Sequence, residues 1–126
     1  MTSNLDRTLD FIAVWSRIDL DAILAVMAPD CLYHNMPWAP LQGHAAIREG
    51  LAAFLSGAQA IDWRVHHAAE NADGVVLTER VDRFLINGQW IEMPVMGTFE
   101  WQAGLLTHWR DYFDSAQFQA AMASIA

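Results

Sequence analysis

The sequence predicts an α+β domain in which N-terminal helices wrap a curved, mixed but mainly antiparallel sheet, forming a cone with a deep pocket. Apolar residues recur at helical spacing up to about residue 57, whereas from residue 61 they alternate. Asn87-Gly88 is a strong hairpin signal, and Gln102-Ala103-Gly104 turns the chain again. Helices followed by a meander of strands are typical of α+β folds. The 126 residues fit a single domain, 1–126.

The helical spacing predicts three helices before the sheet, at about residues 5–17, 20–27 and 44–57. Asp19 is the expected N-cap of the second helix, and Ala28-Pro29 is expected to end it. Residues 31–35 predict a short strand. Pro37 and Pro40 predict that the residues after that strand form a loop.

Four longer strands are expected at residues 61–67, 75–86, 90–101 and 105–113, followed by a short helix that begins near Asp114 or Ser115. A two-residue turn at Asn87-Gly88 would place Arg80 opposite Val95 and Asp82 opposite Met93. A three-residue second loop, 102–104, would then place Val95 opposite Asp111. We favour that loop, although a two-residue loop, which would send Asp111 to the other face, stays open.

Charged residues interrupt two of these strands, at residues 79–82 and 109–114. Arg80 and Asp82 share one face, because strand residues alternate between faces, and Asp111 shares its face with Trp109 and Phe113. A carboxylate among aromatic residues is costly unless it is paired or protonated. On a flat sheet the two carboxylates would lie about 10 Å apart, and Arg80 is long enough to lie between them. The pattern indicates a polar site for acid–base chemistry within an apolar pocket.

Composition excludes several functions. A net charge of −8 argues against nucleic acid and against an anionic membrane surface as partners. No apolar run approaches the length of a membrane span, and no signal peptide precedes the first amphipathic segment. With the single Cys31, which we expect to be a small buried residue, this favours a cytoplasmic location. The five histidines show no metal-ligand spacing, so no metal site is expected.

Four stretches carry a resemblance to a known family: YHNMP at 33–37, TERVD at 78–82, MGTF at 96–99 and WRDYFD at 109–114. On these residues the chain resembles the limonene-1,2-epoxide hydrolases. They belong to a wider group of cone-shaped domains that includes nuclear transport factor 2, ketosteroid isomerase and the SnoaL-like polyketide cyclases. The family's active site comprises a Tyr, an Asn, an Arg and two Asp, which match Tyr33, Asn35, Arg80, Asp82 and Asp111.

The resemblance implies an enzyme that opens a small apolar epoxide, terpene-like or cyclic, with water to give a vicinal diol in one step. Asp111 would be the base, helped by Tyr33 and Asn35 in holding the water, and protonated Asp82 would be the acid. Arg80 would hold the two carboxylates in different protonation states. Neither a cofactor nor a metal is implied. Apolar residues expected to shape the substrate pocket are Phe84, Met93, Val95, Trp109, Phe113 and Phe118.

Three alternatives stay open at this point. The chain could be an isomerase or cyclase of the same fold, working with a single Asp or His on a polycyclic ketone, although the paired carboxylates argue against that. It could be a non-catalytic module that binds a small molecule. It could be a dehalogenase or esterase, although the sequence offers no evident nucleophile.

The outer face of the predicted sheet is unusually apolar. Among Glu79, Arg83 and Glu92 it carries Leu77, Val81, Leu85, Trp90 and Met96. Exposed apolar patches of this kind usually mark an interface. Because two-fold assembly is the commonest arrangement, and because the epoxide hydrolases it resembles form dimers, a homodimer packed sheet against sheet is expected.

Overall fold

The computed structural model describes residues 2–125 and has the predicted fold class. Its helices are α1 (Asn4–Val14), the short 3-10 helix η1 (Trp15–Arg17), α2 (Leu20–Val26), α3 (His44–Gly57) and α4 (Ser115–Ala123). Its strands are β1 (Met27–Asn35), β2 (Leu41–Gln42), β3 (Ala60–Glu70), β4 (Val76–Ile86), β5 (Gln89–Gln102) and β6 (Leu105–Tyr112). None of the helices within residues 2–125 has the length and apolar character needed to cross a membrane.

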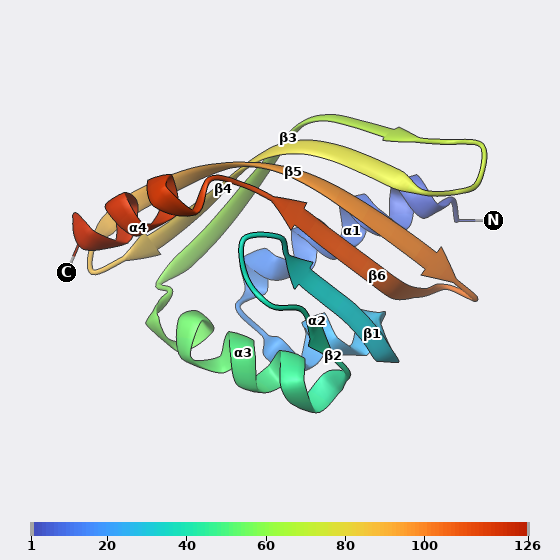
Figure 1. Ribbon diagram of the computed structural model, residues 1–126, viewed down its shortest axis with the longest axis horizontal. Helices are drawn as coiled ribbons and strands as arrows, with labels where there is room; N and C mark the ends of the chain where they lie inside the picture. The colour runs from blue at the N-terminus through green and yellow to red at the C-terminus, as the bar shows by residue number, and fades with distance from the viewer. Residues whose placement is uncertain (1, 126) are drawn as a thin grey trace.

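The six strands form one sheet in the order β2-β1-β6-β5-β4-β3. All neighbours are antiparallel except β1 and β6, which run parallel, so the sheet is mixed, as expected. The long strands curve over α1, α2 and α3 (Figure 1). The C-terminal helix α4 lies at the left end of the sheet in this view and contacts β5. A curved sheet closed by helices on its inner side leaves room for a pocket between the two layers.

The N-terminal half differs from the sequence prediction at two boundaries. Asp19 caps α2 through its side chain, as predicted, but the helix ends at Val26, and β1 already begins at Met27. Ala28-Pro29 therefore lies inside a strand rather than ending a helix. Pro29 is tolerated there because β1 is irregular: its pairing with β6 shifts register between Met27 and Leu32.

The first hairpin register is confirmed. Asn87 and Gly88 both have positive φ, 52° and 73°, and form a two-residue turn that pairs Ile86 with Gln89. Arg80 lies opposite Val95, and Asp82 lies opposite Met93, as predicted.

The predicted register of the second hairpin is wrong. The loop has two residues, Ala103 and Gly104, and pairs Gln102 with Leu105. A register shift then leaves Thr107 as an extra residue, and its hydroxyl donates to the carbonyl oxygen of Glu100 at 3.1 Å. This bulge restores the parity that a two-residue loop would reverse, because one inserted residue exchanges the two faces again. Asp111 therefore points inward, as expected, but it lies opposite Gly97 and not opposite Val95.

The core fills the space between the sheet and the N-terminal helices with aromatic side chains. Trp15 and Trp109 are the largest fully buried residues, and Phe11 makes edge-to-face contacts with both. Cys31 is also fully buried, as expected of a small apolar residue, and burial raises the pKa of its thiol to about 12. The aromatic cluster supports the floor beneath the inward-facing polar residues of β4 and β6.

Candidate active site

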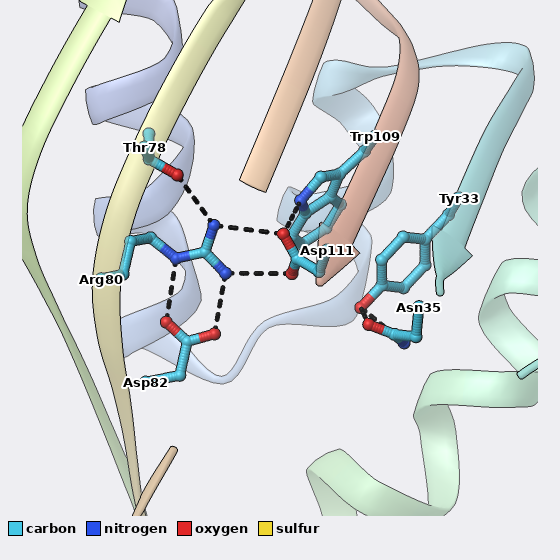
Figure 2. Close-up of polar contacts among 7 residues, drawn as sticks. All are labelled: Tyr33, Asn35, Thr78, Arg80, Asp82, Trp109 and Asp111. Carbon is cyan, nitrogen blue, oxygen red and sulfur yellow. Dashed lines mark hydrogen bonds and ion pairs between the residues drawn. The ribbon is translucent and has the colours of Figure 1, made fainter. Parts of the chain in front are cut away.

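Three strands bring the five polar residues of interest to one place (Figure 2). Arg80 and Asp82 come from β4, and Asp111 comes from β6. Tyr33 and Asn35 come from β1. The parallel pairing of β1 with β6 sets Tyr33 beside Trp109 and Asn35 beside Asp111, although these residues are far apart in the sequence.

Arg80 is the centre of the site, and all five of its N–H donors are used. Nε and Nη2 donate to Oδ1 and Oδ2 of Asp82 at 2.9 and 2.8 Å. Nη1 and Nη2 donate to Oδ1 and Oδ2 of Asp111 at 3.2 and 2.9 Å. The second N–H of Nη1 donates to the hydroxyl oxygen of Thr78 at 3.1 Å. Because both carboxylates share Nη2, they lie much closer together than two strand spacings.

The whole ion cluster is buried: Arg80, Asp82 and Asp111 are 1%, 4% and 3% exposed. Burial raises the pKa of Asp82 to about 6, because desolvation outweighs the hydrogen bonds from Arg80, and the charge of Asp111 adds to the rise. Burial alone would lower the pKa of Arg80, but the two carboxylates raise it well above its usual range. Burial and the neighbouring carboxylate of Asp111 therefore favour the protonated form of Asp82 up to about pH 6, while Arg80 acts in the opposite direction.

Tyr33 and Asn35 form a second polar pair beside Asp111, on the neighbouring strand β1. The amide nitrogen Nδ2 of Asn35 donates to the hydroxyl oxygen of Tyr33 at 3.1 Å. Burial raises the pKa of Tyr33 far above its usual range, and the charge of Asp111 adds to the effect, so its hydroxyl stays protonated. The pair thus offers hydrogen-bonding groups on the same side of the cavity as Asp111.

The cavity beside these groups has a volume of about 400 Å³. Tyr33, Asn35, Asp82 and Asp111 line it, whereas Arg80 does not, which agrees with its lack of a spare donor. Of the residues expected to shape the pocket, the lining includes Phe84, Met93, Val95, Phe113 and Phe118. Trp109 does not line it. It lies behind the wall, fully buried, and donates its indole N–H to Asp111 at 2.8 Å.

Much of the cavity wall is formed by residues that the sequence pattern does not single out. Helices and loops contribute Trp15, Trp38, Ala39, Gly50, Leu51 and Phe54, while β2 contributes Leu41 and β3 contributes Trp63. Only the 3.6-residue spacing of 47, 51 and 55 in α3 hints at an inward face there. Trp38 lies in the predicted loop, and its ring packs edge-on against Phe113 and Phe118 in the cavity lining, with centroids 5.3 and 5.5 Å away. Within residues 2–125 no cluster of three or more His, Cys, Asp or Glu side chains could hold a metal ion.

The chain matches one known protein family over nearly its whole length. The family described as the limonene-1,2-epoxide hydrolase catalytic domain matches residues 2–123, nearly the whole chain. The chain belongs to this family. One curated relative, epoxide hydrolase EphG from Mycobacterium tuberculosis, is 33% identical over 97 residues, which is 76% of this chain. The match spans 63% of the length of EphG.

Similar solved structures show that this chain shares its fold with a wider group of proteins. A limonene-epoxide-hydrolase-like epoxide hydrolase of M. tuberculosis is 26% identical, with a TM-score of 0.78 over 95% of this chain and 90% of the other. A SnoaL-like protein from Shewanella denitrificans has a TM-score of 0.84 at 15% identity, covering 96% and 97% of the two chains. At that identity the likeness shows the fold alone: the cone of the nuclear transport factor 2 and SnoaL-like proteins.

Proposed function

We propose that this protein is an epoxide hydrolase of the limonene-1,2-epoxide hydrolase type. It would add water to an apolar epoxide, terpene-like or cyclic, and release a vicinal diol in one step. The single observation that carries the proposal is the pair of buried carboxylates, Asp82 and Asp111, bridged by Arg80 in the wall of an apolar cavity. An acid and a base at fixed positions in a water-poor site are what direct epoxide opening requires.

On the base side, Asp111 takes a proton from water while the water oxygen bonds to an epoxide carbon. Tyr33 and Asn35 hold that water, since their polar groups line the cavity on the side of Asp111. Fixing the water within reach of both the base and the carbon removes most of the entropic cost of bringing them together.

On the acid side, the carbon–oxygen bond of the epoxide breaks as its oxygen takes the proton of Asp82. The raised pKa of Asp82, about 6, keeps a larger share of this carboxyl protonated than at an ordinary aspartate, and the share is largest below about pH 6. The step leaves Asp111 protonated and Asp82 ionised, so one proton must return from Asp111 to Asp82 before the next turnover. Arg80 serves both states, because it donates to each carboxyl group.

The apolar lining supports an apolar substrate. Polar side chains occupy one wall, while the rest of the cavity is lined by aromatic and aliphatic residues such as Phe54, Trp63 and Met93. The volume of about 400 Å³ falls in the usual range of small-molecule sites. Neither a cofactor nor a metal takes part in the proposed steps, so dialysis against a chelator is expected to leave turnover unchanged.

An isomerase or cyclase, or a module that only binds a small molecule, remains the competing proposal, because related folds carry these functions. A panel of terpene and cyclic epoxides in ¹⁸O-water distinguishes them. An epoxide hydrolase incorporates one ¹⁸O into each diol, whereas the alternatives form no labelled diol. If every epoxide is returned unchanged, the proposed reaction is wrong.

The proposal extends to the assembly and the surroundings of the protein. The outer sheet face exposes Leu77, Trp90, Met96 and Tyr112, at 48%, 40%, 52% and 46%. A second copy packed on this face would bury them in a homodimer. Val81 and Leu85, expected there too, are half-buried.

The net charge of −8 supports the absence of nucleic-acid and anionic-membrane partners. The single cysteine supports a cytoplasmic location.

A further inference from the structure

We infer that Trp109 is a positioning residue that makes Oδ2 of Asp111, and not Oδ1, the atom that takes the proton from water. The inference rests on the proposed function, since it concerns the base of that reaction. It assigns a role to a residue that lies behind the cavity wall and never touches the substrate.

The two oxygens of Asp111 differ in how many donors they already serve. Oδ1 accepts from the indole N–H of Trp109 at 2.8 Å and from Nη1 of Arg80 at 3.2 Å. Oδ2 accepts only from Nη2 of Arg80, at 2.9 Å. A carboxylate oxygen offers about two lone-pair sites. Oδ1 is therefore saturated by these protein donors, whereas Oδ2 keeps one site for a water.

The position of Gly97 supports the same assignment. A Cβ atom at position 97 would lie 2.6 Å from Oδ1 of Asp111, so Oδ1 is pressed against the backbone of β5. Asp111 nevertheless lines the cavity. Oδ2 is the oxygen left to face a water there, on the side where Tyr33 and Asn35 also reach the cavity.

Trp109 is held rigidly enough to fix this choice. It is fully buried, and its ring stacks on Tyr33 with centroids 4.3 Å apart and planes at 17°. It also stacks on Phe99 at 5.4 Å and receives the edge of Phe11 at 5.2 Å. One indole thus orients the base through its N–H and supports the Tyr33 ring through its face, so two of the proposed water ligands depend on it.

The other charged and titratable groups around Asp111 are Arg80 and Asp82 on β4 and Tyr33 on β1. The neighbouring residue on β5, Gly97, has no side chain. The hydrogen bond from the Trp109 N–H occupies Oδ1 of Asp111. Losing it is expected to free Oδ1 as a second, misplaced proton acceptor.

The test replaces the donor without emptying the space. Trp109→Phe removes the N–H, and benzothienylalanine at position 109 removes it while keeping the bicyclic shape. The matched control is Trp101→Phe, because the indole of Trp101 donates to Thr8 at 2.9 Å, away from the carboxylates. We expect kcat to fall roughly 10- to 100-fold in both position-109 variants, the usual effect of losing one hydrogen bond to a charged group, with little change in KM. The control Trp101→Phe should change neither kcat nor KM.

Two comparisons separate positioning from packing. The loss of kcat should be as large in the benzothienylalanine variant, which keeps the bicyclic shape, as in Trp109→Phe, and KM should change little in either. Thermal unfolding of the benzothienylalanine variant should stay close to that of the wild type. An active wild type together with an unchanged kcat in the benzothienylalanine variant would overturn the inference alone. A wild type that opens no epoxide would instead overturn the proposed function.

Discussion

Gly97 of β5 lies directly opposite Asp111 of β6, and the missing side chain is the space in which Arg80 reaches Asp111. A Cβ at position 97 would overlap Nη1 of Arg80 and would lie 2.6 Å from Oδ1 of Asp111. It would also lie 3.1 Å from the hydroxyl of Thr78. The charged cluster therefore depends on glycine at a position that has no unusual backbone angle.

Gly97→Ala is accordingly expected to lower kcat at least about tenfold, because the methyl group pushes Arg80 and Asp111 apart, and to cost about 1–3 kcal/mol of stability through overpacking. Gly57→Ala is the control, since nothing lies within 4 Å of a Cβ there. Steady-state kinetics and chemical denaturation of both variants check the prediction. Full activity in Gly97→Ala would mean that the cluster tolerates rearrangement.

Asp82→Asn and Asp111→Asn are each expected to lower kcat about 10²- to 10⁴-fold, the usual contribution of a general acid or base. Both residues line the cavity, and both bond to Arg80, so an amide of nearly equal shape tests the proton rather than the packing. Diol formation measured beside thermal unfolding separates the two effects. Near-normal turnover in either folded variant contradicts its assigned role.

Arg80→Gln is expected to impair both activity and folding, with a loss of about 3–5 kcal/mol, because it leaves two buried carboxylates unpaired. Arg83→Gln is the matched comparison. Arg83 pairs with Asp62 and Glu92, whose side chains are 45% and 60% exposed, so its loss should change stability far less than the loss of Arg80 and leave kcat unchanged. Equal effects at the two positions in denaturation and kinetic assays would contradict the assignment of Arg80 and Arg83 to opposite faces of the sheet.

Activity is expected to fall as the pH rises above about 6, because the acid Asp82 must be protonated and its pKa is raised to about 6. Stability follows the same direction. A raised carboxyl pKa stabilises the fold fully below the unfolded value of 3.8, and this contribution is lost as the pH rises through about 6. The stability advantage of the wild type over Asp82→Asn should therefore shrink between pH 4 and pH 7. A constant difference across that interval would place the proton elsewhere.

The assembly proposal predicts a dimer in sedimentation equilibrium at micromolar concentration. Met96→Glu should yield monomers, since it puts a charge into the most exposed apolar position of the outer face. Gln102→Glu, at an exposed polar position near the end of β5, is a control that should leave the dimer intact. A wild-type monomer would show that the apolar outer face has some other role.

The sequence by itself determined the fold class and the inward direction of Arg80 and Asp82. Periodicity separated helices from strands, and Asn87-Gly88 fixed the β4–β5 register, because that turn needs two residues with positive φ. Strand alternation then placed Arg80 and Asp82 on one inner face, where they are buried. These features are local, so a short window of sequence contains the physical information that decides them.

Only the tertiary structure decided how the site closes. The bulge at Thr107 depends on pairing with Glu100 across the hairpin, and together with the two-residue loop it puts Asp111 opposite Gly97 instead of Val95. The parallel β1–β6 pairing that brings Tyr33 and Asn35 to Asp111 joins strands more than seventy residues apart. Trp109, expected in the cavity, lies behind it, because its indole N–H bonds to Asp111 and its ring fills the aromatic core. Such contacts join distant segments, and no local pattern specifies them.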